Sequence, residues 1–393
     1  MAFDPLTDEQ REIRDLVRQL ARDRIAPRAA EIDESHEFPW DIVELYREHG
    51  LFGLFFDEAY GGLGTGTLLA LTVIEEVSKV CATSGVILAV QELGSLGLKL
   101  AGNDEQKQRY LPRLASGEIL AAYALTEAGS GSDSAAMRST AQRDGDAYLL
   151  NGSKRFITNA GVASLYTVFA KTDPEAGHPG ISAFVVESDT PGFEVTRLEP
   201  KLGITGSTTG ELAFEDARIP AENLLGEEGD GFKIAMRILD RSRPGIAAQG
   251  LGIAQGATDY ALEYAKSRET MGKPIVEHQL IAAKLADMET ACEAARGLLY
   301  NFGEMVDQGV DGADLTKASA QAKLFCTDTA MWVTTEAVQI LGGYGYIKEY
   351  PVERMMRDAK ITQIYEGTNE IQRLVIAREM LKENRASLLA GVA

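Results

Sequence analysis

Cysteine and histidine are scarce in this chain of 393 residues, which has three cysteines and four histidines. The cysteines, Cys81, Cys292 and Cys326, form no C-x-x-C pair, and no two histidines have metal-ligand spacing. A disulfide framework and a metal site are therefore not expected, and the cysteines are predicted to be small buried apolar residues. The motifs H-E-x-x-H and G-x-S-x-G are absent too, so hydrolysis by zinc or by a serine triad has no support.

Positive charge is also in short supply. Lysine and arginine number 39 against 59 aspartates and glutamates, which gives a formal net charge of −20. Nucleic acid and anionic membranes bind basic faces, so neither is expected as the main partner. Neither G-x-G-x-x-G nor the P-loop motif occurs. An anionic ligand must therefore be held by locally placed arginines, hydroxyl groups and backbone N–H donors.

Long apolar runs are missing as well. The most apolar stretch, around residues 86–100, contains Gln91, Glu92 and Lys99, so no integral membrane segment is expected. The N-terminal segment MAFDPLTDEQREIR is polar and charged, unlike a signal or transit peptide. These features predict a bacterial cytoplasmic protein, or a mitochondrial matrix protein if the chain is a processed mature form.

What is present divides the chain into three parts. Residues 1–119 show helical periodicity with capping signals. Residues 120–230 contain short β-rich runs separated by turn signals, with no helical pattern between them, which predicts an antiparallel barrel or sandwich. Residues 231–393 return to helices of roughly 20–35 residues, which suits an antiparallel bundle. The fold class is therefore predicted to be mainly α with a central β-domain.

Local signals set the expected bounds of the elements. Capping boxes at Thr7–Gln10 and Asn103–Gln106 begin two helices, and the first helix is expected to end near Pro27. The β-rich runs are expected at 121–125, 148–150, 155–158, 166–170, 181–187, 193–197 and 211–214. The later helices are expected near 231–268, 277–308, 314–341, 352–360 and 368–383.

Five segments combine glycines, hydroxyl groups, aromatic rings and charges: ALTEAGSGSD (124–133), KRFITN (154–159), DRSRPGIAAQ (240–249), QILGGYGYI (339–347) and IYEGTNEIQ (364–372). Taken singly, each is compatible with a structural role, such as a turn, a core aromatic, a solvated helix face or a helix terminus. In the last segment, Glu366 stands between Tyr365 and Gly367 just before a helix. A carboxylate among apolar residues can have its pKa raised toward neutrality, which suits a general base.

Taken together, these segments resemble the acyl-CoA dehydrogenase family over nearly the whole chain. ALTEAGSGSDSAA and QILGGYGYIKEYPVERMMRD resemble the two signatures of that family, and KRFITN, SRETMGKPIVEHQ and IYEGTNEIQRLVIARE match in order and spacing. The resemblance implies an N-terminal helical domain (1–119), a middle β-barrel (120–230) and a C-terminal four-helix bundle (231–393).

The resemblance also implies FAD, held in the crevice between the barrel and the bundle of a homotetramer. The residues expected beside the flavin are Tyr123, Leu125, Thr126, Ser132, Phe156, Ile157 and Thr158. Those expected to reach the cofactor of a neighbouring subunit are Arg268, Gln279, Gln339 and Gly343, and Met271 and Ile275 are also expected to bind the cofactor. Thr368 and Asn369, at a helix N-terminus, are expected on the cofactor's phosphates.

In the reaction that the resemblance implies, Glu366 removes the α-proton of an acyl-CoA thioester and a hydride leaves the β-carbon for flavin N5, giving the trans-2-enoyl-CoA. Some branches of the family carry the base near residue 242, but Ser242 cannot deprotonate carbon. Ser132, Asp240 and Arg243 match positions that contact the CoA moiety, and Tyr365 and Gly367 flank the base at the substrate. Electron-transfer flavoprotein is the expected electron acceptor.

The run GIAAQGLGIAQG, from residue 245, resembles short-chain and short-branched-chain members of the family more than long-chain ones, which implies a short straight or 2-methyl-branched acyl chain. Residues 90–97 and 245–251 are expected to line the floor of the acyl pocket. Three alternatives stay open: an acyl-CoA oxidase, a flavin oxidase or monooxygenase acting on a non-CoA substrate, and a catalytically silent FAD- or CoA-binding scaffold.

Overall fold

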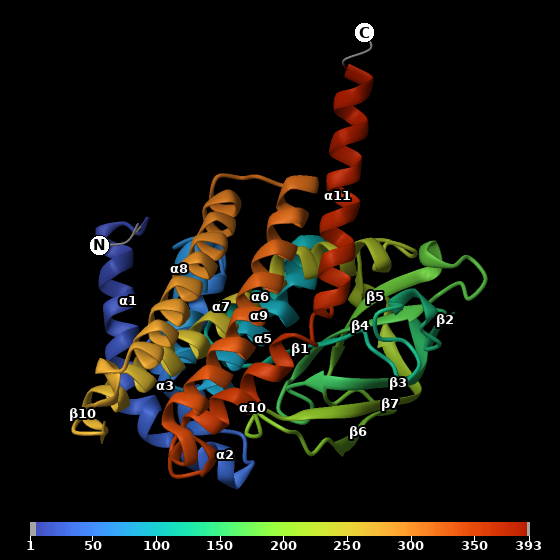
Figure 1. The fold of residues 1–393 in the computed structure, drawn as a ribbon. Coiled ribbons are helices and arrows are strands. Elements are labelled where there is room, and N and C mark those ends of the chain that lie inside the picture. Colours follow the sequence, from blue (N-terminus) through green and yellow to red (C-terminus); the bar gives the residue numbers. More distant parts are fainter. Residues whose placement is uncertain (1–4, 391–393) are drawn as a thin grey trace.

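A computed structural model of the protein describes the backbone of residues 5–390 and the side chains of residues 5–382. Helices, a β-domain and a bundle of long helices follow one another along the chain (Figure 1). One large apolar cluster joins the first and last helical parts, whereas most of the β-domain packs around a second cluster of its own. The predicted fold class, mainly α with a central β-domain, is confirmed.

The first part contains the helices α1 Asp8–Leu20, α2 Ala29–Ser35, α3 Trp40–Glu48, α4 Thr67–Ser78, α5 Ala82–Ala101 and α6 Asp104–Ala115. Both predicted capping boxes are present, before α1 and before α6. The expected end near Pro27 is wrong. α1 ends earlier, and a π turn (Ala21–Ile25) and a 3-10 turn (Ala26–Arg28) lead directly into α2. Pro27 lies in the first turn of a new segment, where its missing N–H breaks no hydrogen bond.

α5 is a core helix. It is the helix within residues 5–390 that is long and apolar enough to cross a membrane, with a mean hydropathy of 1.2, but 83% of that stretch is buried inside the protein. A Cβ atom added to Gly94 would lie 2.6 Å from the Cβ atom of Ala121, so α5 rests directly on the first strand. The apolar side chains of α5 are therefore covered mostly by other parts of the protein.

The β-domain contains the strands β1 Ala121–Ala124, β2 Thr140–Asp144, β3 Ala147–Thr158, β4 Leu165–Lys171, β5 Ile181–Glu187, β6 Phe193–Leu198, β7 Thr209–Pro220 and β8 Leu224–Leu225. The strand order is β6-β7-β3-β2-β4-β5-β8, and β1 pairs with β4. The two runs expected at 148–150 and 155–158 form one strand, β3, because irregularities in its pairing with β7 let it pass through Gly152.

Two features of the β-domain differ from the expectation. The strand β2 was not predicted, because its sequence TAQRD is polar and its last three residues are exposed. β4 pairs in parallel with β1 and with β2, so the wholly antiparallel arrangement is wrong at these two pairs. The remaining pairs of the large sheet are antiparallel.

The last part contains α7 Gly231–Ser267, α8 Gln279–Asp307, α9 Ala313–Leu341, α10 Val352–Thr362 and α11 Asn369–Ala390. α7 contacts α4, α5, α8 and α9 and is the central helix of the molecule. A Cβ atom on Gly252 would lie 2.3 Å from the backbone oxygen of Glu75, and one on Gly256 would lie 1.9 Å from that of Lys79. α7 and α4 therefore cross with their backbones in contact, which only glycine permits at these two positions.

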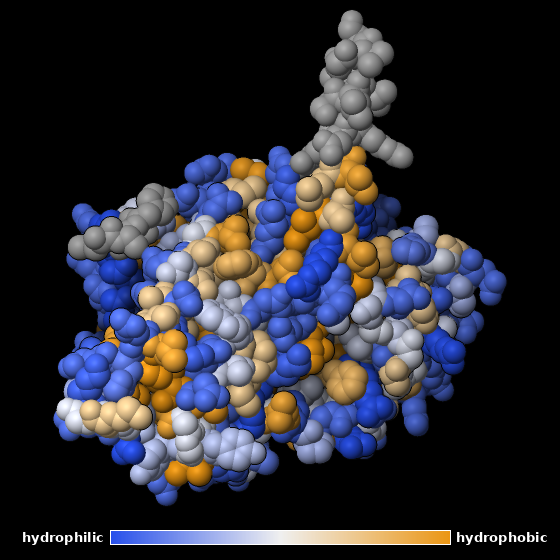
Figure 2. Space-filling model, viewed as in Figure 1, coloured by the Kyte–Doolittle hydropathy of each residue, from blue (hydrophilic) through white to orange (hydrophobic). Residues whose placement is uncertain are grey.

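α11 leaves the body of the molecule and projects away from it (Figure 1). Three apolar side chains on its described part are more than half exposed, namely Leu374 (65%), Met380 (53%) and Leu381 (66%). Figure 2 shows apolar side chains gathered along the lower part of this helix. Leu374 and Leu381 are seven residues apart and so lie on the same side of the helix.

Candidate active site

Glu366 lies on a turn with unusual backbone geometry between α10 and α11. The φ angles of Glu366 and Gly367 are +53° and +90°, in the left-handed region. A Cβ atom on Gly367 would lie 2.7 Å from the side-chain nitrogen of Gln372, so this position requires glycine. A glutamate with positive φ is uncommon, and such residues concentrate at functional sites.

The Glu366 carboxyl group is partly buried and has a direct hydrogen-bond partner. The hydroxyl group of Ser242, on α7, donates to Oε2 at 2.6 Å. Burial raises the pKa of Glu366 to about 7, while Ser242, Arg243 and Lys323 oppose this shift and Glu92 adds to it. The carboxyl group is therefore close to half ionised near neutral pH, as a general base requires.

Arg243 connects Glu366 to the predicted CoA-binding residues. It is 4% exposed, its Nε donates to the backbone oxygen of Glu366 at 3.3 Å, and its Nη1 donates to Asp240 Oδ1 at 2.8 Å. The hydroxyl group of Thr316, on α9, donates to the other oxygen of Asp240 at 2.7 Å. Asp240, Arg243 and Glu366 thus form one hydrogen-bonded chain, and Asp240 and Arg243 lie about three turns into α7, which begins at Gly231.

Two tyrosines lie near the Glu366 carboxyl group, and they differ in whether their hydroxyl groups have a hydrogen-bond partner. The hydroxyl group of Tyr365 donates to Gln249, whose amide donates to the backbone oxygen of Ala82 at 3.0 Å. The hydroxyl group of Tyr123, on β1, is buried and has no partner among the described residues. Burial and the nearby Glu366 charge both raise the pKa of Tyr123. A buried hydroxyl group left without a partner is costly, so a ligand at this point would complete its hydrogen bonding.

The glycine- and serine-rich loop after β1 is anchored by a buried ion pair. Lys154, on β3, donates to Glu127 Oε1 at 2.8 Å, and the side chain of Lys154 is fully buried. Glu127 also accepts from the backbone N–H groups of Arg138 (2.6 Å) and Ser139 (3.0 Å). Both ends of the loop are therefore fastened to one carboxylate, and Ser132 lies exposed on the span between them.

The predicted flavin residues on β1 and β3 lie at neighbouring strand ends. The backbone N–H of Arg155 donates to the backbone oxygen of Thr126 at 2.8 Å, just after Leu125. Phe156 has a φ of +60° and is 58% exposed, whereas Ile157 is buried. Thr158 pairs with Thr209 at the end of β3. An exposed phenylalanine with left-handed backbone presents its ring to a surface that a flat ligand could cover.

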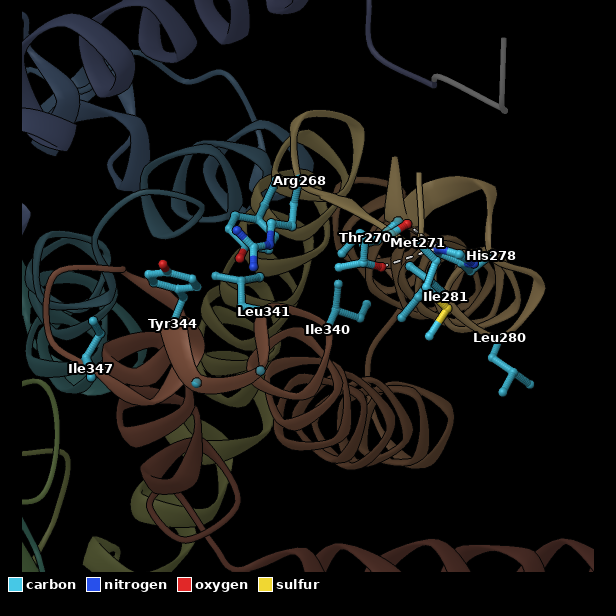
Figure 3. A pocket seen from close by; sticks show the side chains of 14 residues that line it. Arg268, Thr270, Met271, His278, Leu280, Ile281, Ile340, Leu341, Tyr344 and Ile347 are labelled. Carbon is cyan, nitrogen blue, oxygen red and sulfur yellow. Dashed lines mark hydrogen bonds between the residues drawn. The ribbon is translucent and has the colours of Figure 1, made fainter. Parts of the chain in front are cut away.

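A second group of predicted residues lines a separate pocket of about 700 Å³ (Figure 3). Arg268, Met271, Ile275 and Gly343 all line this pocket, and the Arg268 guanidinium lies 5.5 Å from the centre of the Tyr344 ring. Gln279, the first residue of α8, and Gln339, near the end of α9, adjoin residues that line it. The volume is within the range of small-molecule sites.

Asn369 and Thr368 start α11, as predicted, but the two side chains differ in what they can reach. Asn369 is 3% exposed, and its amide bonds to Lys323, Thr327 and Asp328 inside the protein. The side chain is therefore fully engaged, and the backbone N–H of Asn369 donates to the backbone oxygen of Gln363 at 3.0 Å, so the described residues leave Asn369 no free donor for a phosphate. Thr368 accepts from the backbone N–H of Ile371 at 3.4 Å.

Four contacting residues were not singled out from the sequence. Glu127 and Lys154 lie inside two of the five segments. The available signal for their ion pair was a carboxylate just after one predicted strand and a lysine at the start of another. Gln249 lies at the end of a third segment. Lys323 had a weaker signal: it occupies a position on the apolar face of α9, where a lysine is rare without a partner.

The site offers donors that a cofactor such as FAD could use. Within residues 5–382 the Tyr123 hydroxyl group and the backbone N–H groups of Glu366 and Gly367 have no acceptor, and the Glu366 charge lies close enough to Tyr123 to raise its pKa. The pocket beside Arg268 offers a cation and an aromatic ring, which suit a diphosphate and an adenine. The donor set therefore fits an anionic, aromatic cofactor.

Comparisons with known proteins agree with this geometry. Models of the N-terminal, middle and C-terminal domains of acyl-CoA dehydrogenase match residues 7–118, 122–217 and 229–381. The acyl-CoA dehydrogenase of Bacillus subtilis (strain 168) is 50% identical over 377 residues, which are 96% of this chain and 99% of that protein.

Two solved structures have the same fold over nearly the whole chain. Butyryl-CoA dehydrogenase from Megasphaera elsdenii superposes with a TM-score of 0.94 at 44% identity, covering 97% of this chain and 100% of that one. A chain from a structure on the electron transferring flavoprotein of Acidaminococcus fermentans gives a TM-score of 0.94 at 46% identity, with 97% and 100% covered. The chain therefore belongs to the acyl-CoA dehydrogenase family of FAD-binding oxidoreductases.

Proposed function

We propose that this protein converts a short-chain acyl-CoA to the trans-2-enoyl-CoA, with Glu366 as the base that removes the α-proton. The observation that carries this assignment is the Glu366 carboxyl group itself. It is buried enough for a pKa of about 7, yet it stays within hydrogen-bond reach of Ser242. FAD, when bound, supplies the acceptor for the hydride that leaves the β-carbon.

Loss of the α-proton places negative charge on the thioester oxygen, and this charge must be stabilised. The backbone N–H of Glu366 has no acceptor among the described residues and belongs to the same turn as the carboxylate. An N–H donor that is already oriented stabilises a developing oxyanion without reorganisation. We therefore assign the carboxylate and the N–H of Glu366 to the same substrate, at its α-carbon and its carbonyl oxygen. Tyr365 and Gly367 flank this position.

The CoA moiety is proposed to lie along the start of α7 and the loop after β1. Arg243 and Asp240 are held in place by mutual hydrogen bonding. Ser132 is exposed on a loop whose two ends are fixed to Glu127, so its hydroxyl group is available to a bound ligand. These three residues offer the charge and hydrogen-bonding groups that a long polar ligand requires.

The two groups of predicted cofactor residues are proposed to serve different FAD molecules. Arg243, which bonds to the Glu366 turn of the first site, and Arg268, which lines the second pocket, are 25 positions apart (268 − 243) along the α7 segment, roughly 37 Å at 1.5 Å per residue. This span is longer than an extended FAD molecule, so the pocket beside Arg268 is available to the cofactor of a neighbouring subunit. The exposed Leu374 and Leu381 on α11 are compatible with burial in such an assembly, which we propose to be a homotetramer.

Three further assignments rest on the relatives. The match to butyryl-CoA dehydrogenase supports a short acyl chain, and the match to a chain in the Acidaminococcus structure supports electron-transfer flavoprotein as the electron acceptor. The bacterial origin of the Bacillus relative supports a bacterial cytoplasmic setting rather than a mitochondrial one. We keep 1–119, 120–230 and 231–393 as the proposed domain boundaries.

The decisive experiment is the visible spectrum of the purified protein before and after anaerobic addition of butyryl-CoA. We expect oxidised flavin bands that bleach on addition, and a Glu366→Gln variant that keeps the bands but loses turnover by several orders of magnitude. A variant that retains more than about a tenth of the activity, a loss of roughly 1.4 kcal/mol or less, would rule out Glu366 as the base.

The same spectra separate the alternatives. Unchanged flavin bands with every acyl-CoA tested would favour a flavin enzyme that acts on a non-CoA substrate. Reoxidation by oxygen at the rate of turnover would indicate an oxidase. A protein without flavin bands, even after reconstitution with FAD, would favour the catalytically silent scaffold.

A further inference from the structure

The turn that carries the base is held by side chains from three helices. The backbone oxygen of Gly367 accepts from Lys323 Nζ, on α9, at 2.9 Å and from Gln372 Nε2, on α11, at 2.9 Å. The backbone oxygen of Glu366 accepts from Arg243, on α7, at 3.3 Å. Left-handed backbone at a non-glycine residue is strained, and it persists only where the surrounding structure holds it in place. Here the hydrogen bonds donated by Lys323, Gln372 and Arg243 hold the turn in its left-handed conformation.

Lys323 differs from the other two donors because it is a fully buried ammonium group. It is 0% exposed, and besides Gly367 it donates to Asn369 Oδ1 at 2.8 Å. The Asn369 amide is fixed in turn, because its nitrogen donates to Thr327 at 2.9 Å and to Asp328 at 2.7 Å. The ammonium group therefore has one set position, between the turn and the first residue of α11.

A buried positive charge requires negative charge nearby. The charged groups that face Lys323 are Glu366 on the turn, Arg243 on α7, Asp328 on α9 and Glu370 on α11. Burial lowers the pKa of Lys323 to about 7, and the Glu366 carboxylate acts against this shift. The influence is mutual, since the ammonium group also lowers the pKa of Glu366, against its burial.

We propose that Lys323 is a positioning residue for the reaction: its ammonium group fixes the Gly367 carbonyl, and thereby aims the carboxylate and the N–H of Glu366, while its charge favours the ionised base. This inference rests on the proposed function of Glu366. It assigns a task in the reaction to a residue that donates its hydrogen bonds to Gly367 and Asn369 of the protein itself.

The test compares FAD-loaded Lys323→Met with the wild type and with Thr334→Val. Thr334 is buried on the same helix, and its hydroxyl group bonds only to backbone oxygens of that helix. For Lys323→Met we expect kcat to fall at least about tenfold with little change in KM, because the base is misaimed after the substrate has bound. The acid limb of kcat/KM should move up by about one pH unit, because the ionised base loses a nearby positive charge. Thr334→Val should leave both unchanged.

A merely structural role for Lys323 gives a different pattern. Lys323→Met would then lower the thermal midpoint but leave kcat and the pH profile in place, as is expected for Thr334→Val, and this result would overturn the proposal. If Lys323→Met does not fold, Lys323→Gln removes the same charge with a polar side chain and provides the same comparison.

A readout without substrate separates this proposal from the proposed function. In FAD-loaded protein labelled with ¹³C at the glutamate carboxyl carbons, the resonance missing from Glu366→Gln reports the ionisation of Glu366 directly. An upward shift of its midpoint in Lys323→Met supports the inference even if no acyl-CoA is turned over, an outcome that would defeat the proposed function alone. An unshifted midpoint overturns the inference whatever the wild-type activity.

Discussion

The Glu366 carboxyl group has neighbours with opposite effects on its ionisation. The hydroxyl group of Ser242 donates to it and stabilises the charged form, whereas the carboxyl group of Glu92, on α5, disfavours a second negative charge nearby. Burial raises the pKa of Glu92 itself, and within residues 5–382 no hydrogen bond or ion pair to its carboxyl group is present. The pKa of the base is therefore set by a balance that single substitutions can move in either direction.

Substitution Ser242→Ala should raise the pKa of Glu366. Loss of the donated hydrogen bond destabilises the carboxylate, so the acid limb of kcat/KM should move to higher pH by about half a unit to one unit. The pH dependence of kcat/KM with butyryl-CoA measures this shift. A limb that stays in place would mean that the hydrogen bond from Ser242 is not made in the free enzyme.

Substitution Glu92→Gln should have the opposite sign. It removes a like charge while keeping the size of the side chain, so the pKa of Glu366 should fall and the acid limb should move to lower pH. We expect a smaller shift than for Ser242→Ala, because among the described residues Glu92 makes no hydrogen bond to Glu366 and acts on it through its charge alone. A shift to higher pH would show that Glu92 acts on the site in some other way.

At the scale of single residues, much of the candidate site could be predicted because its residues lie in short, recognisable segments of the sequence. Glu366, Arg243 and Asp240 lie in short segments whose residue types are unusual together. Lys323 could not be predicted in the same way, because its role depends on a backbone oxygen 44 residues away in sequence. A hydrogen bond to a backbone carbonyl leaves no mark on the identity of the acceptor residue.

At the scale of single elements, the pair Lys154 and Glu127 fastens the loop after β1 to β3. Substitution Lys154→Met leaves a buried carboxylate without its counter-charge, which should lower the free energy of unfolding by about 3 kcal/mol or more. FAD retention should fall too, because the loop and the β3 end would lose their fixed spacing. Thermal unfolding and the flavin-to-protein absorbance ratio measure the two effects.

The double variant Lys154→Met/Glu127→Gln is the matched control for this pair. It removes both charges, so stability should recover in large part while the loop stays less well fixed. If the double variant is as unstable as Lys154→Met alone, the loss comes from packing rather than from the unpaired charge.

Asp358, on α10, is a second buried carboxylate with a structural task. It accepts from the backbone N–H of Ile204 at 2.5 Å, and burial raises its pKa to about 6. A raised pKa in the folded state means that its contribution to stability is full below the unfolded value near 4 and is lost as the pH rises through 6.

Substitution Asp358→Asn should therefore change stability in a pH-dependent way. The variant keeps an oxygen acceptor for Ile204 but has no charge to bury. Its stability relative to the wild type should rise by up to about 3 kcal/mol between pH 4 and pH 7. Thermal midpoints of both proteins across this range give the difference, and parallel curves would contradict the burial of an ionised Asp358.

Elements with strong local signals were predicted well, and those defined by distant partners were not. The capping boxes at Thr7 and Asn103 determine helix starts from four consecutive residues. The polar strand β2 and the parallel pairs of β4 depend on which segments meet in space, and no run of residues encodes that directly. The π turn at Ala21–Ile25 likewise follows from packing, since its sequence has ordinary helical character.

At the scale of the whole molecule, the exposed apolar side of the projecting α11 predicts that this helix takes part in assembly. A charge at Leu374 or Leu381 would face the same side of an exposed helix, so Leu374→Asp/Leu381→Asp should prevent burial of that side between subunits. Light scattering should then show a smaller species than the wild type. If the pocket beside Arg268 serves a neighbouring subunit, the variant should also lose FAD, although neither leucine lines that pocket.

The matched control for this assembly test is Leu63→Asp. Leu63 is 43% exposed and belongs to the loop between α3 and α4, not to α11. It should leave both molecular mass and flavin content unchanged. An α11 double variant that keeps the wild-type mass would contradict a role of α11 in assembly.

The contact between the backbones of α4 and α7 has a consequence for the order in which the molecule opens. Gly252 and Gly256 leave no space between the two helices, and the middle of α7 is buried on all sides. The amide hydrogens there should exchange with solvent only when the entire protein unfolds, whereas those of the 366–367 turn and of the segment around Arg268 should exchange through small local openings. The Glu366 turn and the segment around Arg268, where ligands are expected, can therefore fluctuate independently while the centre of α7 remains closed.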